Sequence, residues 1–206
     1  MASAAVSPTA IRAFRDSAAF ERWLARHHDT EREIYIRIFK KASDVATVTY
    51  AQALDVALCW GWIDGIRKAL DTESFLQRFT PRKPKSVWSQ INRDHVARLI
   101  EENRMTPHGL KQVDAAKADG RWQDAYASPR TMTTPEDLLV AIRASKKAFA
   151  AYEGLNSVNR YALAWRLGRL KTVAAREKRI AMYVAMLERG ETLHPNGTGN
   201  KKRTKS

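Results

Sequence analysis

The strongest constraint on the fold is a change in the spacing of apolar residues between residues 120 and 134. Before it, residues 33–39 alternate and are β-branched or aromatic, which is typical of a half-buried strand. Residues 62–70 and 74–80 are two short runs on either side of a turn, which predicts an antiparallel hairpin. After the change, apolar residues recur every three or four positions, which predicts helices only. We therefore expect an α+β protein with a small antiparallel sheet flanked by helices, followed by a helical unit.

Apolar periodicity and capping residues predict helices on both sides of the strands. The expected helices span residues 17–26, 49–60, 89–102, 107–118, 135 onward, 156 onward and 172–189. A stretch rich in Gly, Pro, Ser and Thr at 118–134 indicates a linker. We expect an α+β unit over residues 1–125, a helical domain over 126–192 and a disordered basic tail over 193–206.

The composition excludes several classes of protein. Apolar residues make up 44% of the chain and six residues are tryptophan, so most of the chain should not be intrinsically disordered. No run approaches the roughly 18 apolar residues of a membrane span. Arg12 and Arg15 interrupt the apolar N-terminal stretch, so we expect no signal peptide and a cytoplasmic location. Cys59 is the one cysteine, which excludes an internal disulfide and a cysteine-cluster zinc site.

The net charge of +14 favours acidic partners over basic ones. Residues 1–130 carry a net +5 and residues 131–206 a net +9, of which +4 lies in the last six residues. Two basic clusters stand out: Arg78, Arg82, Lys83 and Lys85 in the first part, and Arg160, Arg166, Arg169, Lys171, Arg176, Lys178 and Arg179 in the second. They are either solvated faces that favour solubility or a docking surface for phosphate, carboxylate or nucleic acid.

The densest group of unusual residues is the segment 60–65, Trp-Gly-Trp-Ile-Asp-Gly. Gly61 ends the predicted helix and permits an unusual backbone angle between two indoles. In an architectural interpretation the tryptophans fill the core, and Asp64 pairs with Arg67 or Arg78 or caps backbone N–H groups, because a buried carboxylate must be paired. In a functional interpretation this tryptophan–aspartate corner forms part of a ligand pocket.

The functional interpretation adds the basic loop 78–83 and the helix start 88–92. A helix N-terminus beside Arg and Lys favours an anion, because the free N–H groups and the helix dipole both attract negative charge. Tryptophan walls suit a flat or apolar ligand with an acidic group. The expected ligand-binding residues are Trp60, Trp62, Asp64, Arg67, Arg78, Arg82, Lys83, Trp88, Ser89 and Asn92. Asp64 would be the acid–base group if a reaction is catalysed.

No motif points to a cofactor or a metal. The chain has no phosphate-binding loop, dinucleotide fingerprint or nucleophile elbow, so an enzymatic function is not favoured. The adjacent His27 and His28, and the pair His95 and His108, lack the spacing of metal ligands.

The runs 57–65, 78–83 and 86–92 resemble the bacterial YdeI/OmpD-associated family, whose members are also described as bacteriocin-protection proteins. The resemblance continues through 104–110 and into the C-terminal helices, at Leu167, Lys171, Arg176, Arg179, Ile180 and residues 186–190. It implies a helical C-terminal domain and a contribution to resistance against cationic peptides. The chain departs from the family pattern at 173–175, where Val-Ala-Ala replaces an expected Pro-Glu-Thr.

The residues and the resemblance together predict a small cytoplasmic binding and stress-resistance protein that engages an anionic small molecule or an acidic surface. Two alternatives remain. The first is weak, non-specific nucleic-acid binding by the basic helices and tail, and the second is a small-molecule enzyme that uses Asp64. Direct capture of a cationic peptide is disfavoured, because a protein of charge +14 repels it.

Overall fold

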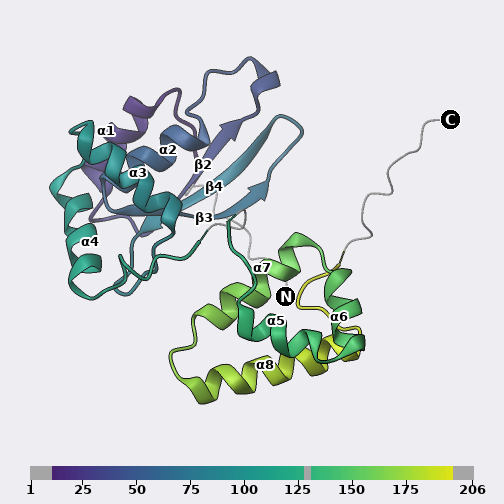
Figure 1. Ribbon diagram of the computed structural model, residues 1–206. Helices are drawn as coiled ribbons and strands as arrows, with labels where there is room; N and C mark the ends of the chain where they lie inside the picture. The colour runs from purple at the N-terminus through teal and green to yellow at the C-terminus, as the bar shows by residue number, and fades with distance from the viewer. Residues whose placement is uncertain (1–10, 128–130, 197–206) are drawn as a thin grey trace. The chain divides into compact units, whose positions relative to one another are not determined.

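The computed structural model describes residues 11–127 and 131–196 (Figure 1). The chain divides into two compact units, residues 1–125 and 126–206. In the described part of the chain, the first unit contains a four-stranded sheet with α-helices, and the second contains helices. The predicted α+β class is confirmed.

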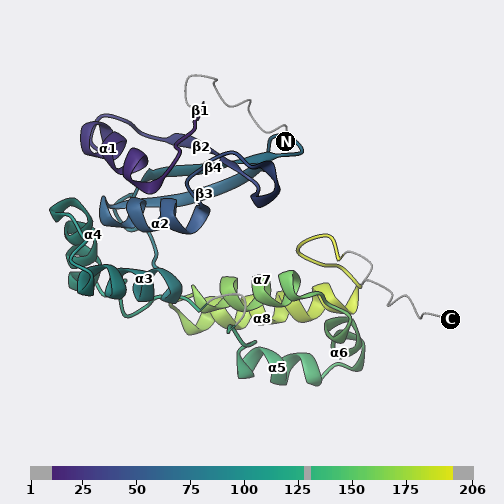
Figure 2. The same ribbon diagram turned by 90° about the horizontal axis from the view of Figure 1, so that it is seen from above.

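The sheet has the strand order β1-β2-β4-β3 (Figure 2). The strands are β1 (Ile11–Arg12), β2 (Ile34–Phe39), β3 (Trp62–Ala69) and β4 (Ser74–Pro81). The predicted hairpin is present as β3 and β4, and β4 also pairs antiparallel with β2. The short β1 pairs parallel with β2 and was not foreseen, because two residues carry no periodicity. A register shift between Asp64 and Arg67 interrupts β3, which is an edge strand.

The helices of the first unit are α1 (Ser17–His27), α2 (Tyr50–Cys59), α3 (Gln90–Glu101) and α4 (Pro107–Ala118), with a short 3-10 turn at Lys41–Ser43. Each begins where the sequence offers a cap: the side chains of Asp16, Thr49, Ser89 and Thr106 accept a hydrogen bond from a backbone N–H in the first turn. Thr49 and Gln52 form a reciprocal capping box.

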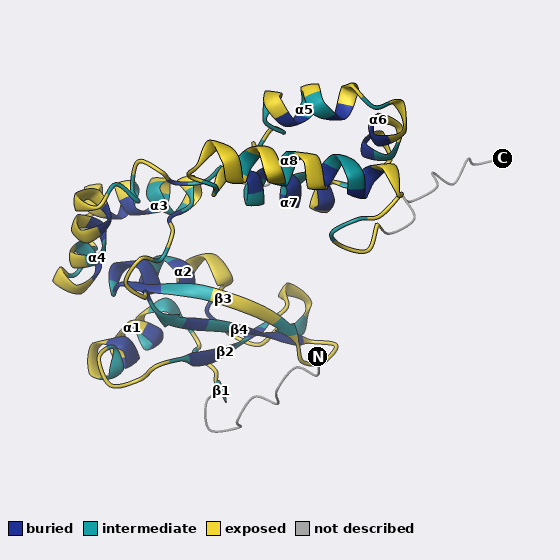
Figure 3. Ribbon diagram, turned by 90° about the horizontal axis from the view of Figure 1, so that it is seen from below, coloured by how far each residue is buried: buried dark blue, intermediate teal, exposed yellow. Residues whose placement is uncertain are grey.

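Helix α2 organises the first unit because it is apolar on two sides. Ala53, Val56 and Ala57 join the cluster that α1 forms with one face of the sheet. Leu54, Leu58 and Cys59 join a second cluster with α3 and α4. Figure 3 accordingly shows α2 largely buried, whereas exposed turns alternate with buried ones along α4. A helix that is apolar around most of its circumference is stable only when it is buried on both sides.

Glycine is required at two contacts between α2 and α4. Gly61 follows α2 with φ +73°, and a Cβ there would lie 2.9 Å from the carbonyl oxygen of His108. At Gly109 a Cβ would overlap the carbonyl oxygen of Cys59, so α4 approaches the end of α2 backbone to backbone. This approach sets the position of Trp60 and Gly61, through which the tryptophan–aspartate corner passes from α2 into β3.

The second unit contains α5 (Glu136–Arg143), α6 (Lys146–Glu153), α7 (Ser157–Gly168) and α8 (Val173–Glu188). Their inward residues form one cluster that includes Leu138, Leu163 and Tyr183. The periodicity after residue 134 did not separate α5 from α6. Ser145 makes the break, since its hydroxyl caps α6 by accepting the backbone N–H of Ala148.

The first residues of the expected disordered tail, 193–196, contact the helical unit. Leu193 packs against the helical cluster, and the backbone N–H of His194 donates to Asn159 Oδ1 at 2.9 Å. The Asn196 amide donates to the carbonyl of Gly154 at 2.8 Å. These contacts hold residues 193–196 on α7, because the buried Asn159 needs polar partners. The rest of the expected tail, 197–206, lies outside the described residues.

A membrane-crossing helix is absent from the described ranges, where none combines sufficient length with sufficient apolar character.

Candidate functional site

The two tryptophans of the tryptophan–aspartate corner lie in different surroundings. Trp62 is fully buried against α1, where its indole N–H donates to the carbonyl of His28 at 3.2 Å and its ring meets Trp23 edge-on. Trp60 is half-buried and stacks on His108 with ring centroids 5.7 Å apart. Trp62 therefore fills the core, as the architectural interpretation expects.

Asp64 is held by a residue that the sequence did not suggest. The Tyr50 hydroxyl, at the start of α2, donates to Asp64 Oδ2 at 2.8 Å. Burial, and then the negative charge of Asp64, raise the pKa of the Tyr50 hydroxyl. The two arginines expected beside Asp64 are engaged elsewhere. The Arg67 guanidinium lies over the Phe75 ring at 3.6 Å, and Arg78 pairs with Glu33 at 2.6 Å.

Arg82 belongs to the interior. Its backbone N–H donates to the carbonyl of Gly61 at 2.9 Å, which ties the basic loop to the end of α2. Its guanidinium lies 3.5 Å from the centroid of the Trp88 ring, and Nη1 donates to the carbonyl of Val87 at 3.3 Å. Arg82 is 6% exposed and Trp88 is 2% exposed, so a ligand at the surface would reach neither side chain. These contacts hold the basic loop against the end of α2.

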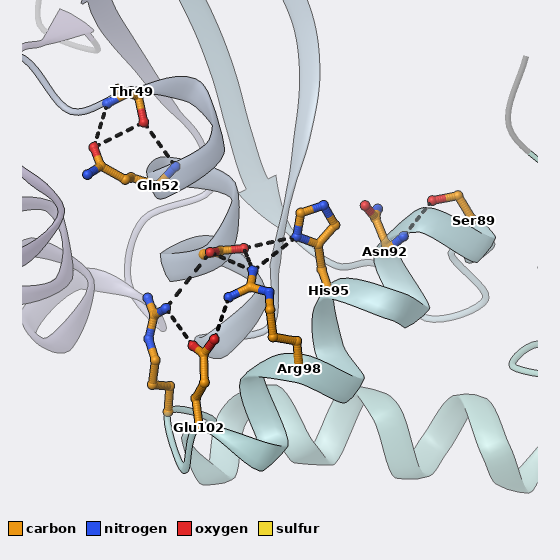
Figure 4. Close-up of polar contacts among 9 residues, drawn as sticks. Thr49, Gln52, Ser89, Asn92, His95, Arg98 and Glu102 are labelled. Carbon is orange, nitrogen blue, oxygen red and sulfur yellow. Dashed lines mark hydrogen bonds and ion pairs between the residues drawn. The ribbon is translucent and has the colours of Figure 1, made fainter. Parts of the chain in front are cut away.

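At the start of α3 the predicted anion site is partly used by the chain itself. The Ser89 hydroxyl accepts the backbone N–H of Asn92 at 3.1 Å, as Figure 4 shows, which satisfies one of the free donors that an anion would need. Lys83 remains exposed in the loop before the helix. Of the ten residues of the predicted site, Trp62, Arg82 and Trp88 are buried, while Arg67 and Arg78 contact Phe75 and Glu33. Ligand binding at this corner stays a prediction.

A different surface forms around Trp122, a residue that the sequence did not single out. The Trp122 ring meets Trp88 edge-on at 4.9 Å, and Arg121 donates to the carbonyl of Ser86 at 2.8 Å, so residues 119–122 lie beside the basic loop. Two cations lie near the ring: Arg93 of α3 at 5.4 Å and Lys117 of α4 at 5.7 Å from its centroid. We call Lys83, Lys85, Arg93, Lys117 and Trp122 the Trp122 surface. Trp122 lies far from residues 60–65 in the sequence, so no local pattern predicted that it would contact Trp88.

A second polar group that the sequence did not reveal joins α2 to α3. Asp55 accepts two hydrogen bonds of 2.7 Å from Arg98 Nη2, and His95 Nδ1 lies 3.1 Å from its Oδ1 (Figure 4). Arg98 also pairs with Glu102 at 2.9 Å, and the carboxylates raise the pKa of Arg98. Because Arg98 already neutralises Asp55, the arrangement is an ion-pair clamp between helices rather than a base that activates His95. Asp55 is the one charged residue in the mostly apolar α2, and this feature of the sequence could have indicated that it has a partner on another element.

The basic cluster of the second unit is largely engaged within that unit. Arg176 donates to Asp137 at 2.6 Å and 2.9 Å, which lowers the pKa of the Asp137 carboxyl. Arg160, Arg169 and Arg179 each lie over an aromatic ring, at 5.0 to 5.9 Å from the centroid. These contacts fit the interpretation of the cluster as a packed and solvated face better than a line of free cations.

The Cys59 thiol is buried at the end of α2, and burial raises its pKa to about 11. Groups of three or more potential metal ligands are absent from residues 11–127 and 131–196.

Two family models match the chain. Residues 12–112, which include the tryptophan–aspartate corner and the Asp55 clamp, match a domain of unknown function, DUF8412. Residues 131–190, which include α5 to α8, match the family described as bacteriocin-protection, YdeI or OmpD-associated. Searches of curated proteins and of solved structures found no match. The suspected family is thus confirmed through the C-terminal helices, while the motifs at 57–92 lie within the other match. Over residues 131–190, the helical unit of this chain is similar to the bacteriocin-protection, YdeI or OmpD-associated family.

Proposed function

We propose that this protein binds an anionic small ligand at the Trp122 surface and that it contributes to stress or peptide resistance through that binding. The observation that carries the proposal is the position of Trp122 between a cation from α3 and a cation from α4. The proposed binding site is thus the Trp122 surface, whereas the sequence predicted a site at the tryptophan–aspartate corner. The proposed ligand class, a small anionic molecule, is the class that the sequence suggested.

The charges of the Trp122 surface support an acidic partner. Lys83, Lys85, Arg93 and Lys117 make no ion pair within the part of the chain that the structure describes. Nearby, Asp119 is bound by Arg121 at 2.7 Å, so its charge is already compensated. Unpaired cations around a partly exposed indole attract an anion and offer a flat wall to its apolar part.

The sign of the charge also limits how peptide resistance would arise. A protein with a net charge of +14 slows its own encounter with a cationic peptide, so the proposed role is indirect, through a small anionic ligand. The cytoplasmic location stays a prediction from the sequence, and cell fractionation with an antibody against the native protein would test it.

Calorimetric titration with citrate, inorganic pyrophosphate and benzoate would test the proposal, since these probes separate charge from an aromatic body. We expect at least one to bind, with affinity reduced about tenfold or more in Lys117→Ala and in Arg93→Ala, as loss of one charge-assisted contact predicts. Lys111→Ala is the matched control, because Lys111 is an exposed lysine of the same helix. Unchanged affinity in both test variants, or no binding by the wild-type protein, would reject the Trp122 surface.

Nucleic acid is the competing ligand at this surface, because single strands also bind through stacked aromatics and cations. A single-stranded oligonucleotide in the same titration distinguishes the two. Tight binding that weakens steeply with salt, and that exceeds every small anion, would favour the nucleic-acid alternative.

A further inference from the structure

A hollow of about 550 Å³ opens on the first unit, and its lining includes none of the Trp122 surface residues. Three segments line it: β1 supplies Arg12, α1 supplies Trp23, and the chain entering β2 supplies Thr30, Glu31, Arg32, Glu33 and Ile34. Its volume falls in the range of about 300–1,000 Å³ that small-molecule sites occupy.

The floor and the rim of the hollow differ in character. Trp23 is 9% exposed and Ile34 is 1% exposed, so both belong to the hydrophobic core, and Trp23 supplies most of the apolar floor that a ligand could touch. The side chains of Arg12, Glu31 and Arg32 are exposed. An apolar floor under a charged rim suits a small molecule with an apolar body and ionised groups at one end.

Charges of both signs remain available at the rim. Arg12, Arg32 and Glu31 have no side-chain ion-pair or hydrogen-bond partner within the described residues. Glu33 differs, because Arg78 binds its carboxylate at 2.6 Å and neutralises it. The hollow therefore offers two open guanidiniums and one open carboxylate.

We propose that this hollow binds a small zwitterion of the amino-acid type with an apolar side chain. A guanidinium binds a carboxylate through two parallel N–H donors, which Arg12 or Arg32 provides. Glu31 accepts the ammonium group, and the apolar side chain lies on Trp23. A simple anion would be repelled by the carboxylate of Glu31. A molecule without charged groups would neutralise neither the guanidiniums nor that carboxylate. The site is separate from the Trp122 surface and does not depend on the proposed function.

The test compares three probes by calorimetry on the full chain: L-leucine, 4-methylpentanoate and 3-methylbutylamine. The second probe lacks the ammonium group and the third lacks the carboxylate, while all three carry a branched apolar group. We expect L-leucine to bind at least about tenfold more tightly than either, which corresponds to about 1.4 kcal/mol. In ¹H–¹⁵N spectra, the backbone amides of residues 30–34 and the Trp23 indole N–H should shift during the titration.

Two variants and two matched controls locate the site. Arg32→Met and Glu31→Gln should each weaken L-leucine binding about tenfold or more, since each removes one charge-assisted contact. Arg22→Met and Glu21→Gln remove the same charges from exposed positions on α1 and should leave the affinity unchanged. Equal binding of 4-methylpentanoate, absence of saturable binding by L-leucine, or unchanged affinity in both test variants would overturn the proposal. Lys117→Ala should not affect this titration, so failure here is distinguishable from failure of the Trp122 surface.

Discussion

Arg98 on α3 donates two hydrogen bonds of 2.7 Å through one nitrogen to the carboxylate of Asp55 on α2. The Asp55 side chain is 14% exposed, whereas that of Arg98 is 41% exposed. The Asp55 carboxylate therefore loses more of its hydration than the Arg98 guanidinium does. Its contacts with Arg98 and His95 offset the free-energy cost of that loss. This relationship joins the helix at the centre of the first unit to the helix that carries Arg93 of the Trp122 surface.

Removing the Asp55 carboxylate should destabilise the first unit. Asp55→Ala should lower the free energy of unfolding by about 1–3 kcal/mol, because His95 and the buried side of Arg98 lose their acceptor. Urea denaturation followed by tryptophan fluorescence measures the change. Asp114→Ala, at an exposed position of α4, is the control and should change stability by less than about 0.5 kcal/mol. Equal effects of the two substitutions would show that the clamp contributes nothing.

The backbone contact between α2 and α4 should not tolerate a methyl group. In Gly109→Ala, the new Cβ would overlap the carbonyl oxygen of Cys59, and backbone atoms cannot yield as a side-chain end can. We expect a loss of about 1–3 kcal/mol or more, which is the usual range for overpacking.

Gly168→Ala provides the matched control for this substitution, since Gly168 ends α7 and a Cβ added there would meet no atom within 4 Å. It should be neutral, or stabilising by up to about 1 kcal/mol, because alanine favours the helix. Thermal unfolding monitored by circular dichroism distinguishes the two outcomes. A Gly109→Ala protein as stable as wild type would contradict the close approach.

The ion pair between Asp137 and Arg176 should make the second unit sensitive to acid. Hydrogen bonds from Arg176 lower the pKa of the folded Asp137 carboxyl below its ordinary value of 3.8. The unfolded chain therefore binds the proton first, so the stabilisation is complete above about pH 5 and is lost as the pH falls through the folded pKa. The Asp137 side chain is 44% exposed, so the contribution should be below about 1 kcal/mol.

Asp137→Asn should reduce this pH dependence, whereas Glu177→Gln, at an exposed position of α8, should retain it. Denaturation at intervals between about pH 2 and pH 6 provides the comparison. An identical pH profile for Asp137→Asn and wild type would exclude the ion pair as its source.

The thiol of Cys59 should be inert in the native protein. Burial raises its pKa to about 11, and the thiolate is the reactive form, so little nucleophile is present at pH 8. We expect Ellman's reagent to react at the rate at which the first unit opens, and immediately in concentrated guanidinium chloride. Asp55→Ala should speed the native reaction by destabilising α2. Immediate reaction of the native wild-type protein would contradict the packing of α2 against α3 and α4.

Much of the fold was readable in the sequence because helices, strands and caps depend on neighbouring residues. Thr49 three positions before Gln52 predicts a helix start wherever the helix packs, and the alternation at 33–39 predicts a strand. The strand β1 and the break between α5 and α6 were missed, since two residues or a single capping serine carry too weak a pattern.

The partners of the candidate site residues were decided by tertiary packing. Nothing near Asp64 in the sequence points to Tyr50, and nothing near Trp122 points to Arg93. Such pairs form because the packing of helices on a sheet brings distant side chains together and excludes water around them. The sequence by itself determined which side chains each segment carries: a basic loop with tryptophans near it, and one acidic residue in a mostly apolar helix. Only the tertiary structure decided which charges are compensated by a partner, as Asp55 is, and which have no ion pair among the described residues, as is the case for Arg32 and Lys117.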